Sequence, residues 1–143
     1  MAPGLSLLGS DGHSGVRTAT GAETQVRALA ITRVAIGAVL VAVPGPALRA
    51  WLGGQADSPA ARLLARSVGG RDIALGLGAI FALRHGASVG GWLEGGLVAD
   101  ATDGLAMVAA SRRLPAARVL AALAPTIGAV GLGGRLVSRL RAP

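Results

Sequence analysis

The sequence contains no cysteine, and it is poor in histidine and in aromatic residues. Without cysteine the chain can form no disulfide, no thiolate metal site and no thiol redox centre. Two histidines, His13 and His85, are too few for a multi-histidine metal site, so we expect neither a metal nor a cofactor. The aromatic residues are limited to Trp51, Phe81 and Trp92, which leaves almost nothing on which nucleic-acid bases could stack.

Lysine is also absent, so every one of the 14 basic residues is an arginine, and the net charge is +7. A basic chain can bind nucleic acid, but these arginines are scattered along the sequence, and we expect no nucleic-acid partner. Hydrophobic residues make up 52% of the chain and charged residues 15%, against about 25% charged in soluble domains. The chain therefore has too little polar surface for a soluble globule of its size, and the lipid bilayer is its expected environment.

Four apolar stretches separated by turn signals predict an all-α fold, a four-helix transmembrane bundle. A helix of about twenty residues crosses the roughly 30 Å apolar layer of a membrane. The expected spans are residues 26–43, 65–84, 92–111 and 115–134. Residues 1–19 lack a signal-peptide pattern and are expected to be a mobile tail. Residues 20–134 then form the four-helix domain, and residues 135–143 a basic C-terminal tail.

Local signals predict where the helices begin and end. Thr20 and Glu23 have the spacing of a capping box at the start of the first helix. The prolines in residues 44–46 end that helix, and residues 47–52 are expected to form a short anchor at the membrane interface. Ser58, followed by proline, predicts the cap of the second helix.

Two further patterns concern packing and orientation. Gly70, Ala74 and Gly78 recur every four residues, which predicts a ridge of small residues for close helix contact. The distribution of arginines between alternate loops favours both termini in the cytoplasm under the positive-inside rule. The expected location is therefore the cell membrane, crossed several times.

Charged residues recur near the centres of three of the four expected spans. They are Arg33 in the first, Arg71 and Asp72 in the second, and Asp100 and Asp103 in the third. Each ion at a bilayer centre costs about 2.5–3.5 kcal/mol on insertion scales, so we expect these side chains to face inward and pair. Asp100 and Asp103 are three residues apart and project from one helical face. Two positive and three negative charges would be balanced by one proton.

This cluster has two interpretations. In the first, its ion pairs are structural and fix which helices pack together and in what register. In the second, it is a ligand pocket or a proton path. The candidate catalytic acids are then Asp72, Asp100 and Asp103, and the candidate ligand-binding residues are Arg33 and Arg71.

Several short motifs together resemble a known family. They are Arg33…Gly37 with Pro44, Gly70-Arg71-Asp72 with Gly76, and Trp92 with Asp100-x-x-Asp103. The family is that of uncharacterised small four-helix integral membrane proteins of high-GC bacteria, grouped as a domain of unknown function. The resemblance covers about residues 26–134 and implies a membrane bundle, with no activity or catalytic residue to carry over. The layout is more distantly similar to DoxX-like membrane proteins, often regarded as accessory subunits.

Three functions are compatible with these features. The favoured one is an accessory or interaction subunit with a structural polar core, which binds a membrane-protein partner or forms a homo-oligomer. The alternative is a membrane-embedded acid–base enzyme acting on a lipophilic small molecule, isoprenoid-like or quinone-like. The third is a component of a proton-coupled transporter. The sequence leaves open whether the chain is an enzyme.

Overall fold

The computed structural model describes residues 12–53, 56, 58–113 and 115–141, and these residues are almost entirely helical. The helices are α1 (Gly12–Ala42), α2 (Pro44–Leu52), α3 (Pro59–Arg84), α4 (Gly90–Ala110), the 3-10 helix η2 (Ser111–Arg113) and α5 (Ala116–Arg141). The described part of the chain contains no strand, which confirms the predicted all-α fold. Residues 1–11 of the predicted N-terminal tail lie outside the described residues.

α1 begins earlier than its sequence suggests and ends where predicted. It starts at Gly12, so the expected cap at Thr20 is wrong, because Thr20 lies within the helix. No proline occurs between these two residues to remove a helical hydrogen-bond donor. α1 ends at Ala42, and Val43 has a non-helical backbone as the residue before a proline. Pro44 then occupies the first position of α2, where its missing N–H is no loss.

α3 has the start and the end that its sequence predicts. The hydroxyl oxygen of Ser58 accepts a hydrogen bond from the backbone N–H of Ala61 at 3.1 Å, which satisfies one of the free donors at the helix start. The helix ends at Arg84, and Gly86 follows it with a φ of +62°. Glycine takes up this left-handed conformation without the strain that a side chain would cause.

α5 is longer than predicted. The segment expected to be the basic tail, residues 135–143, is helical as far as Arg141, so the helix continues past the expected span. Leu136, within the extra turns, is fully buried and packs in a cluster with Val26 of α1 and Leu93 of α4. Burial of an apolar side chain of this size stabilises the turns that carry it.

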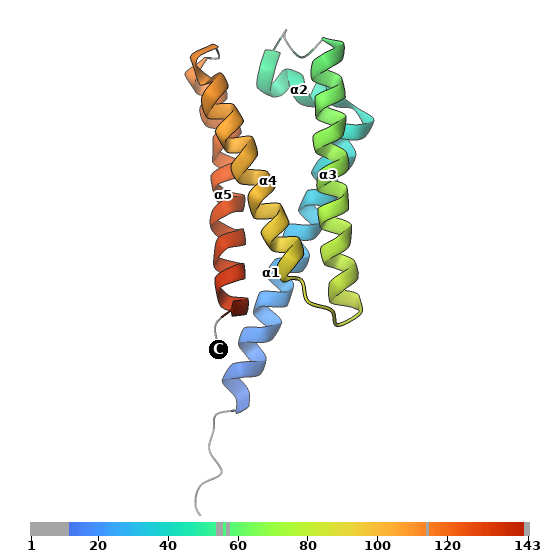
Figure 1. Ribbon diagram of the computed structural model, residues 1–143, viewed down its shortest axis with the longest axis vertical. Helices are drawn as coiled ribbons and strands as arrows, with labels where there is room; N and C mark the ends of the chain where they lie inside the picture. The colour runs from blue at the N-terminus through green and yellow to red at the C-terminus, as the bar shows by residue number, and fades with distance from the viewer. Residues whose placement is uncertain (1–11, 54–55, 57, 114, 142–143) are drawn as a thin grey trace, which may run out of the picture.

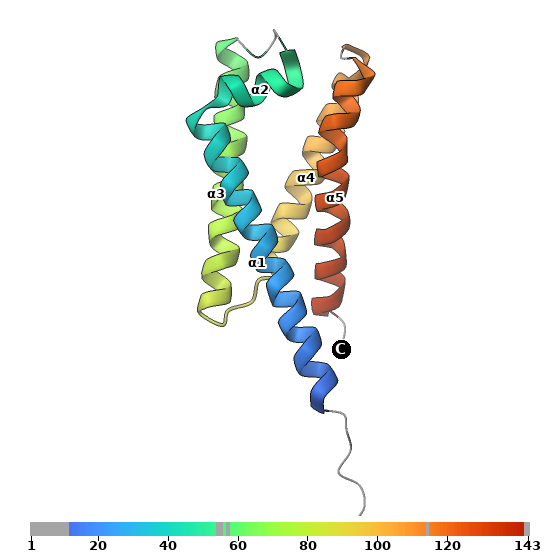
Figure 2. The same ribbon diagram turned by 180° about the vertical axis from the view of Figure 1, so that it is seen from behind.

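The four long helices form two pairs that diverge toward one end of the molecule. α1 packs along α3, and α4 packs along α5. The two views in Figures 1 and 2 show α2 crossing the end at which the pairs stand apart. One apolar cluster closes the opposite end, where α3 turns into α4. A second cluster fixes α2 against α1 and α3.

Glycine residues bring the backbones of α1 and α3 into direct contact. A Cβ atom at Gly37 would lie 2.5 Å from the carbonyl oxygen of Gly69, and one at Gly76 would lie 2.6 Å from that of Ala30. No side chain fits at such distances, so glycine is required at these positions. Interfaces of this kind are typical of close-packed membrane helices.

The small-residue ridge predicted from Gly70, Ala74 and Gly78 is not the one that packs on α1. A Cβ atom at Gly70 would meet nothing within 4 Å, and Ala74 is exposed. Gly78 instead accommodates the ring of Trp92 from α4. The reason is that α3 turns Asp72 toward α1. Gly69, three residues before Asp72, and Gly76, four residues after it, lie on the same face of the helix and are buried with it.

Candidate functional site

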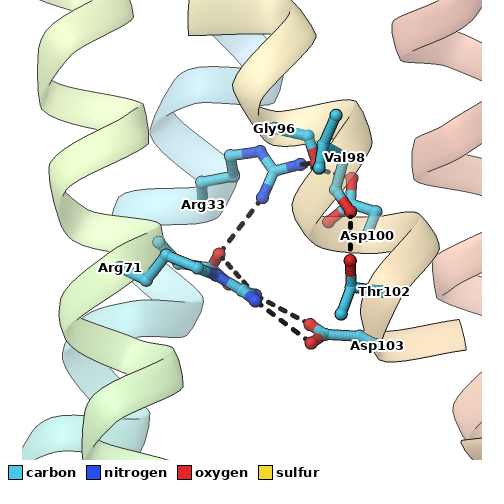
Figure 3. A network of polar contacts seen from close by, with 8 residues as sticks. Arg33, Arg71, Gly96, Val98, Asp100, Thr102 and Asp103 are labelled. Atoms are coloured by element: carbon cyan, nitrogen blue, oxygen red, sulfur yellow. Dashed lines mark hydrogen bonds and ion pairs between the residues drawn. The ribbon is translucent and has the colours of Figure 1, made fainter. Parts of the chain in front are cut away.

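The five charged residues predicted to cluster do lie together, joined by ion pairs. Figure 3 shows the contacts of Arg33, Arg71, Asp100 and Asp103. Arg33 comes from α1, Arg71 and Asp72 from the middle of α3, and Asp100 and Asp103 from the middle of α4. We call these five residues the Arg/Asp network. Their predicted pairing is confirmed, while their predicted roles as acids or ligand-binding groups remain predictions.

Arg33 joins α1 to both neighbouring helices. Its Nη1 atom donates to Oδ1 of Asp72 at 3.1 Å, and its Nη2 atom donates to the carboxylate of Asp100. Nη2 also donates to the backbone carbonyl oxygen of Gly96 at 3.3 Å. A Cβ atom at Gly96 would lie 3.0 Å from that same nitrogen, so glycine leaves room for the guanidinium against the backbone of α4.

Arg71 makes a two-pronged contact across the α3–α4 interface. Its Nη1 and Nη2 atoms donate to the two carboxylate oxygens of Asp103, at 3.0 Å and 2.7 Å. Parallel hydrogen bonds of this kind are among the strongest that side chains form. Nη2 also lies 3.2 Å from Oδ1 of Asp72. That single oxygen therefore accepts from both arginines and links the two halves of the network.

The network has a buried part and a more open part. The side chains of Arg33, Asp72 and Asp100 are only 12–13% exposed, and we call them the inner trio. Arg71 is 31% exposed and Asp103 41%, and we call them the outer pair. Figure 3 shows the outer pair bridging α3 and α4, with Arg33 in contact with Asp100.

The spaces near the network differ in size and lining. A small cavity of about 10 Å³ touches Arg33 and Asp100 and has room for about one water molecule. A groove of about 370 Å³ lies along α1 beneath α2. Its lining is wholly apolar: Ala35, Ile36, Val39, Leu40 and Ala47. No residue of the network borders this groove.

Two positions show what the sequence can and cannot indicate. Gly96 accepts a hydrogen bond through its carbonyl oxygen and leaves room for Arg33. In the sequence, the only feature that points to this role is its position one helical turn before Asp100, on the same side of the helix. In α5, the expected span places Thr126 at the level of the charges, and its methyl group lies against Gly104 of α4. Among the described residues, no group of three or more His, Cys, Asp or Glu side chains is placed to hold a metal ion.

The chain matches no protein-family model, no curated protein and no solved structure. The resemblance to small four-helix membrane proteins of high-GC bacteria therefore stays a prediction.

One segment of the described chain, Gly21–Ala42 in α1, is long and apolar enough to cross a membrane. A single such helix near the N-terminus is weak evidence, since core helices and signal sequences have the same length and composition. In a soluble protein, however, such a helix is mostly buried, and only 22% of this window is. In α3 and α4, the network charges themselves interrupt the apolar sequence.

Proposed function

We propose that the chain is a small integral membrane protein that crosses the bilayer four times and serves as an accessory or interaction subunit. One observation carries the membrane part of this proposal: two charged side chains are buried inside the bundle while many large apolar side chains face outward. Only Asp72 and Asp100 are charged and buried among the described residues. Large apolar side chains two-thirds exposed or more include Leu63 and Leu64 of α3, Val98 and Leu105 of α4, and Leu120 and Ile127 of α5, each 66–72% exposed.

In water this arrangement would be unfavourable. Monomeric soluble proteins rarely expose contiguous apolar patches larger than a few hundred Å², and each Å² removed from water is worth about 25 cal/mol. In hydrocarbon the same surface carries no penalty. The lengths also fit, since α3, α4 and α5 have 26, 21 and 26 residues. At about 1.5 Å per residue, each is long enough for an apolar layer of roughly 30 Å.

The sizes of the cavities favour a structural network over a catalytic one. A lipophilic substrate needs a pocket of about 300 Å³ or more, and the cavity at Arg33 and Asp100 holds about 10 Å³. The larger groove lacks an acid or base in its lining. All five charged groups bind one another, which suits a core that specifies helix partners. A proton path is also disfavoured, because the arginines between the aspartates stay protonated.

An even number of crossings places both ends of the domain on one side of the membrane. Figure 1 shows the beginning of α1 and the end of α5 at the same end of the bundle. We propose that this side is cytoplasmic, from the distribution of arginines.

The membrane proposal can be tested with single cysteines, because the chain has none of its own. Val98→Cys lies on the outer face of α4 near its middle, and Ala87→Cys lies in the exposed loop between α3 and α4. We expect the protein to resist extraction from membranes by alkaline carbonate. In inverted membrane vesicles, which expose the proposed cytoplasmic side, a water-soluble maleimide should label Ala87→Cys rapidly and Val98→Cys only after detergent is added. Release by carbonate, or equal labelling of both positions in intact membranes, would exclude a membrane-spanning bundle.

A second measurement separates the accessory role from an enzymatic one. Cells that produce the wild-type chain, Asp100→Asn or Asp103→Asn are compared by native electrophoresis of membranes and by lipid extraction. An interaction subunit predicts altered abundance or assembly with unchanged lipids. A lipid composition that shifts only when both aspartates are intact would favour the enzyme.

A further inference from the structure

The outer pair presents a charge problem that the inner trio does not. α1, α3 and α4 cover Arg33, Asp72 and Asp100 on most sides, whereas Arg71 and Asp103 remain 31% and 41% exposed at the same height. Hydrocarbon offers such groups no hydrogen bond and no counter-charge. If the bundle crosses the bilayer as proposed above, something polar must cover this pair.

We propose that a second copy of this chain covers it, through the face of α3 and α4 that carries the outer pair. The two copies are related by a two-fold axis along the bundle. This inference rests on the proposed membrane location and specifies the partner of the proposed interaction subunit.

The surroundings of the outer pair allow another helix to come close. On each helix, the residues four before and three after the charged residue lie on its stripe. These neighbours are Ser67 and Ala74 around Arg71 on α3, and Ala99 and Ala106 around Asp103 on α4. All four are small, and three of them, Ser67, Ala74 and Ala106, are exposed. Small side chains let membrane helices approach until their backbones are in van der Waals contact.

The pattern of charge identifies the partner. Arg71 and Asp103 stand side by side at one height, because two hydrogen bonds of 3.0 Å and 2.7 Å join them. A two-fold axis along the bundle keeps the height of every residue and exchanges left and right. Arg71 of one copy therefore faces Asp103 of the other, and the reverse contact occurs as well. A patch that is complementary to itself in this way is what a symmetric dimer requires.

The same symmetry predicts which small residues meet. α3 and α4 run in opposite directions (Figure 1), so residues before Arg71 and after Asp103 lie toward the same end. At about 1.5 Å per residue, Ser67 is about 6 Å and Ala106 about 4.5 Å from the level of the outer pair. Ser67 of one copy should thus lie opposite Ala106 of the other.

Cross-linking between two differently tagged copies tests this contact. One copy carries Ser67→Cys and the other Ala106→Cys, and they are produced together and oxidised in membranes. We expect a disulfide-linked dimer that contains both tags. The matched control replaces Ser67→Cys with Leu120→Cys, an equally exposed position on the outer face of α5, and should give at most about one-tenth of that yield. Equal yields, or a dimer only in the control, would overturn the inference.

A charge exchange tests whether the outer pair itself directs the contact. The variant Arg71→Asp/Asp103→Arg keeps an ion pair within the chain and remains complementary to itself. Mixed with the wild-type chain, it opposes like charges, which disfavours association. We expect cross-links between two exchanged copies and at least about tenfold fewer between exchanged and wild-type copies. Equal mixing would refute the charge-directed dimer.

The two proposals fail in different ways. A chain that carbonate extracts from membranes fails as a membrane protein, and the dimer inference fails with it. A chain that stays in the membrane without Ser67–Ala106 cross-links refutes the dimer alone. If the charge-exchanged variant does not accumulate, the cross-link between Ser67→Cys and Ala106→Cys still decides whether the dimer forms. Cross-links from Ala106→Cys to a different membrane protein, without any to a second copy, would also refute self-association.

Discussion

Replacement of Arg33 by glutamine should destabilise the protein more than any single aspartate-to-asparagine change in the network. Arg33 is ion-paired with both Asp72 and Asp100. With all groups ionised, its loss changes the charge of the network from −1 to −2. Asp72 keeps its contact with Arg71, whereas Asp100 loses the ion pair that holds α4 to α1.

The magnitude follows from the cost of leaving a buried charge without its partner. Removing one member of a buried ion pair costs about 3–5 kcal/mol, and we expect Arg33→Gln to lower the free energy of unfolding by that amount. Asp100→Asn instead leaves two arginines and two aspartates, and its amide oxygen still accepts from Arg33. The expected loss is about 1 kcal/mol. The double variant Arg33→Gln/Asp100→Asn has no unpaired carboxylate at position 100. Its free energy of unfolding should therefore fall by only about 1–2 kcal/mol.

The free energies are measured by SDS titration in mixed micelles, followed by circular dichroism and tryptophan emission. Trp92 packs over Gly78 and borders the cavity at Arg33, so its emission reports on the network region. Arg27→Gln is the matched control on the same helix, because the Arg27–Glu23 pair is about half exposed and is worth about 0.5 kcal/mol or less. If the losses of Arg33→Gln and Asp100→Asn simply add in the double variant, the two residues are not coupled and the reasoning is wrong.

Three further predictions use the same assay. Gly37→Ala should lower the free energy of unfolding by about 1–3 kcal/mol, because its Cβ would lie 2.5 Å from a backbone oxygen of Gly69. Gly70→Ala, in open space on the partner helix α3, should raise it by about 0.5–1 kcal/mol, and equal effects of the two changes would contradict the glycine contact. Ser58→Ala should cost about 1 kcal/mol through loss of the helix cap, while an unchanged midpoint would show that the cap is dispensable. Leu136→Ala should cost about 2–5 kcal/mol, because the side chain is fully buried; no loss would mean that the last turns of α5 are not packed.

Sequence reasoning succeeds where the signal is local or where chemistry leaves one solution. Pro44 ends α1 because a proline restricts its predecessor and lacks a donor, and Ser58 caps α3 because its hydroxyl reaches the third backbone N–H. Charges within apolar helices must pair or be neutralised. The sequence alone therefore restricts the partners of Arg33 and Arg71 to a few carboxylates.

It fails where the answer depends on which side of a helix meets which neighbour. The four-residue repeat places the small-residue ridge at Gly70 instead of Gly69, a shift of one residue that turns the helix face by about 100°. The continuation of α5 beyond the expected span also has no local signal, because it goes with the burial of Leu136 against α1 and α4. Thr20 matches a capping pattern that the longer α1 does not use. The errors at Gly70 and in α5 concern tertiary contacts that no local pattern encodes.

The position of the network explains why this bundle uses charges at all. The apolar clusters lie toward the two ends of the molecule, around Leu136 at one end and Leu48 at the other. At mid-height the α1–α3 contact is built around glycine residues packed against backbone and aliphatic side chains. In lipid, such contacts allow close approach without specifying one register among several. Arg33 removes that ambiguity, because only one register brings it within reach of both Asp72 and Asp100. If α1 slides by one turn, about 5.4 Å, Arg33 loses its partners and a charge is left unpaired in hydrocarbon. The network therefore selects the native alignment by making the alternative alignments costly.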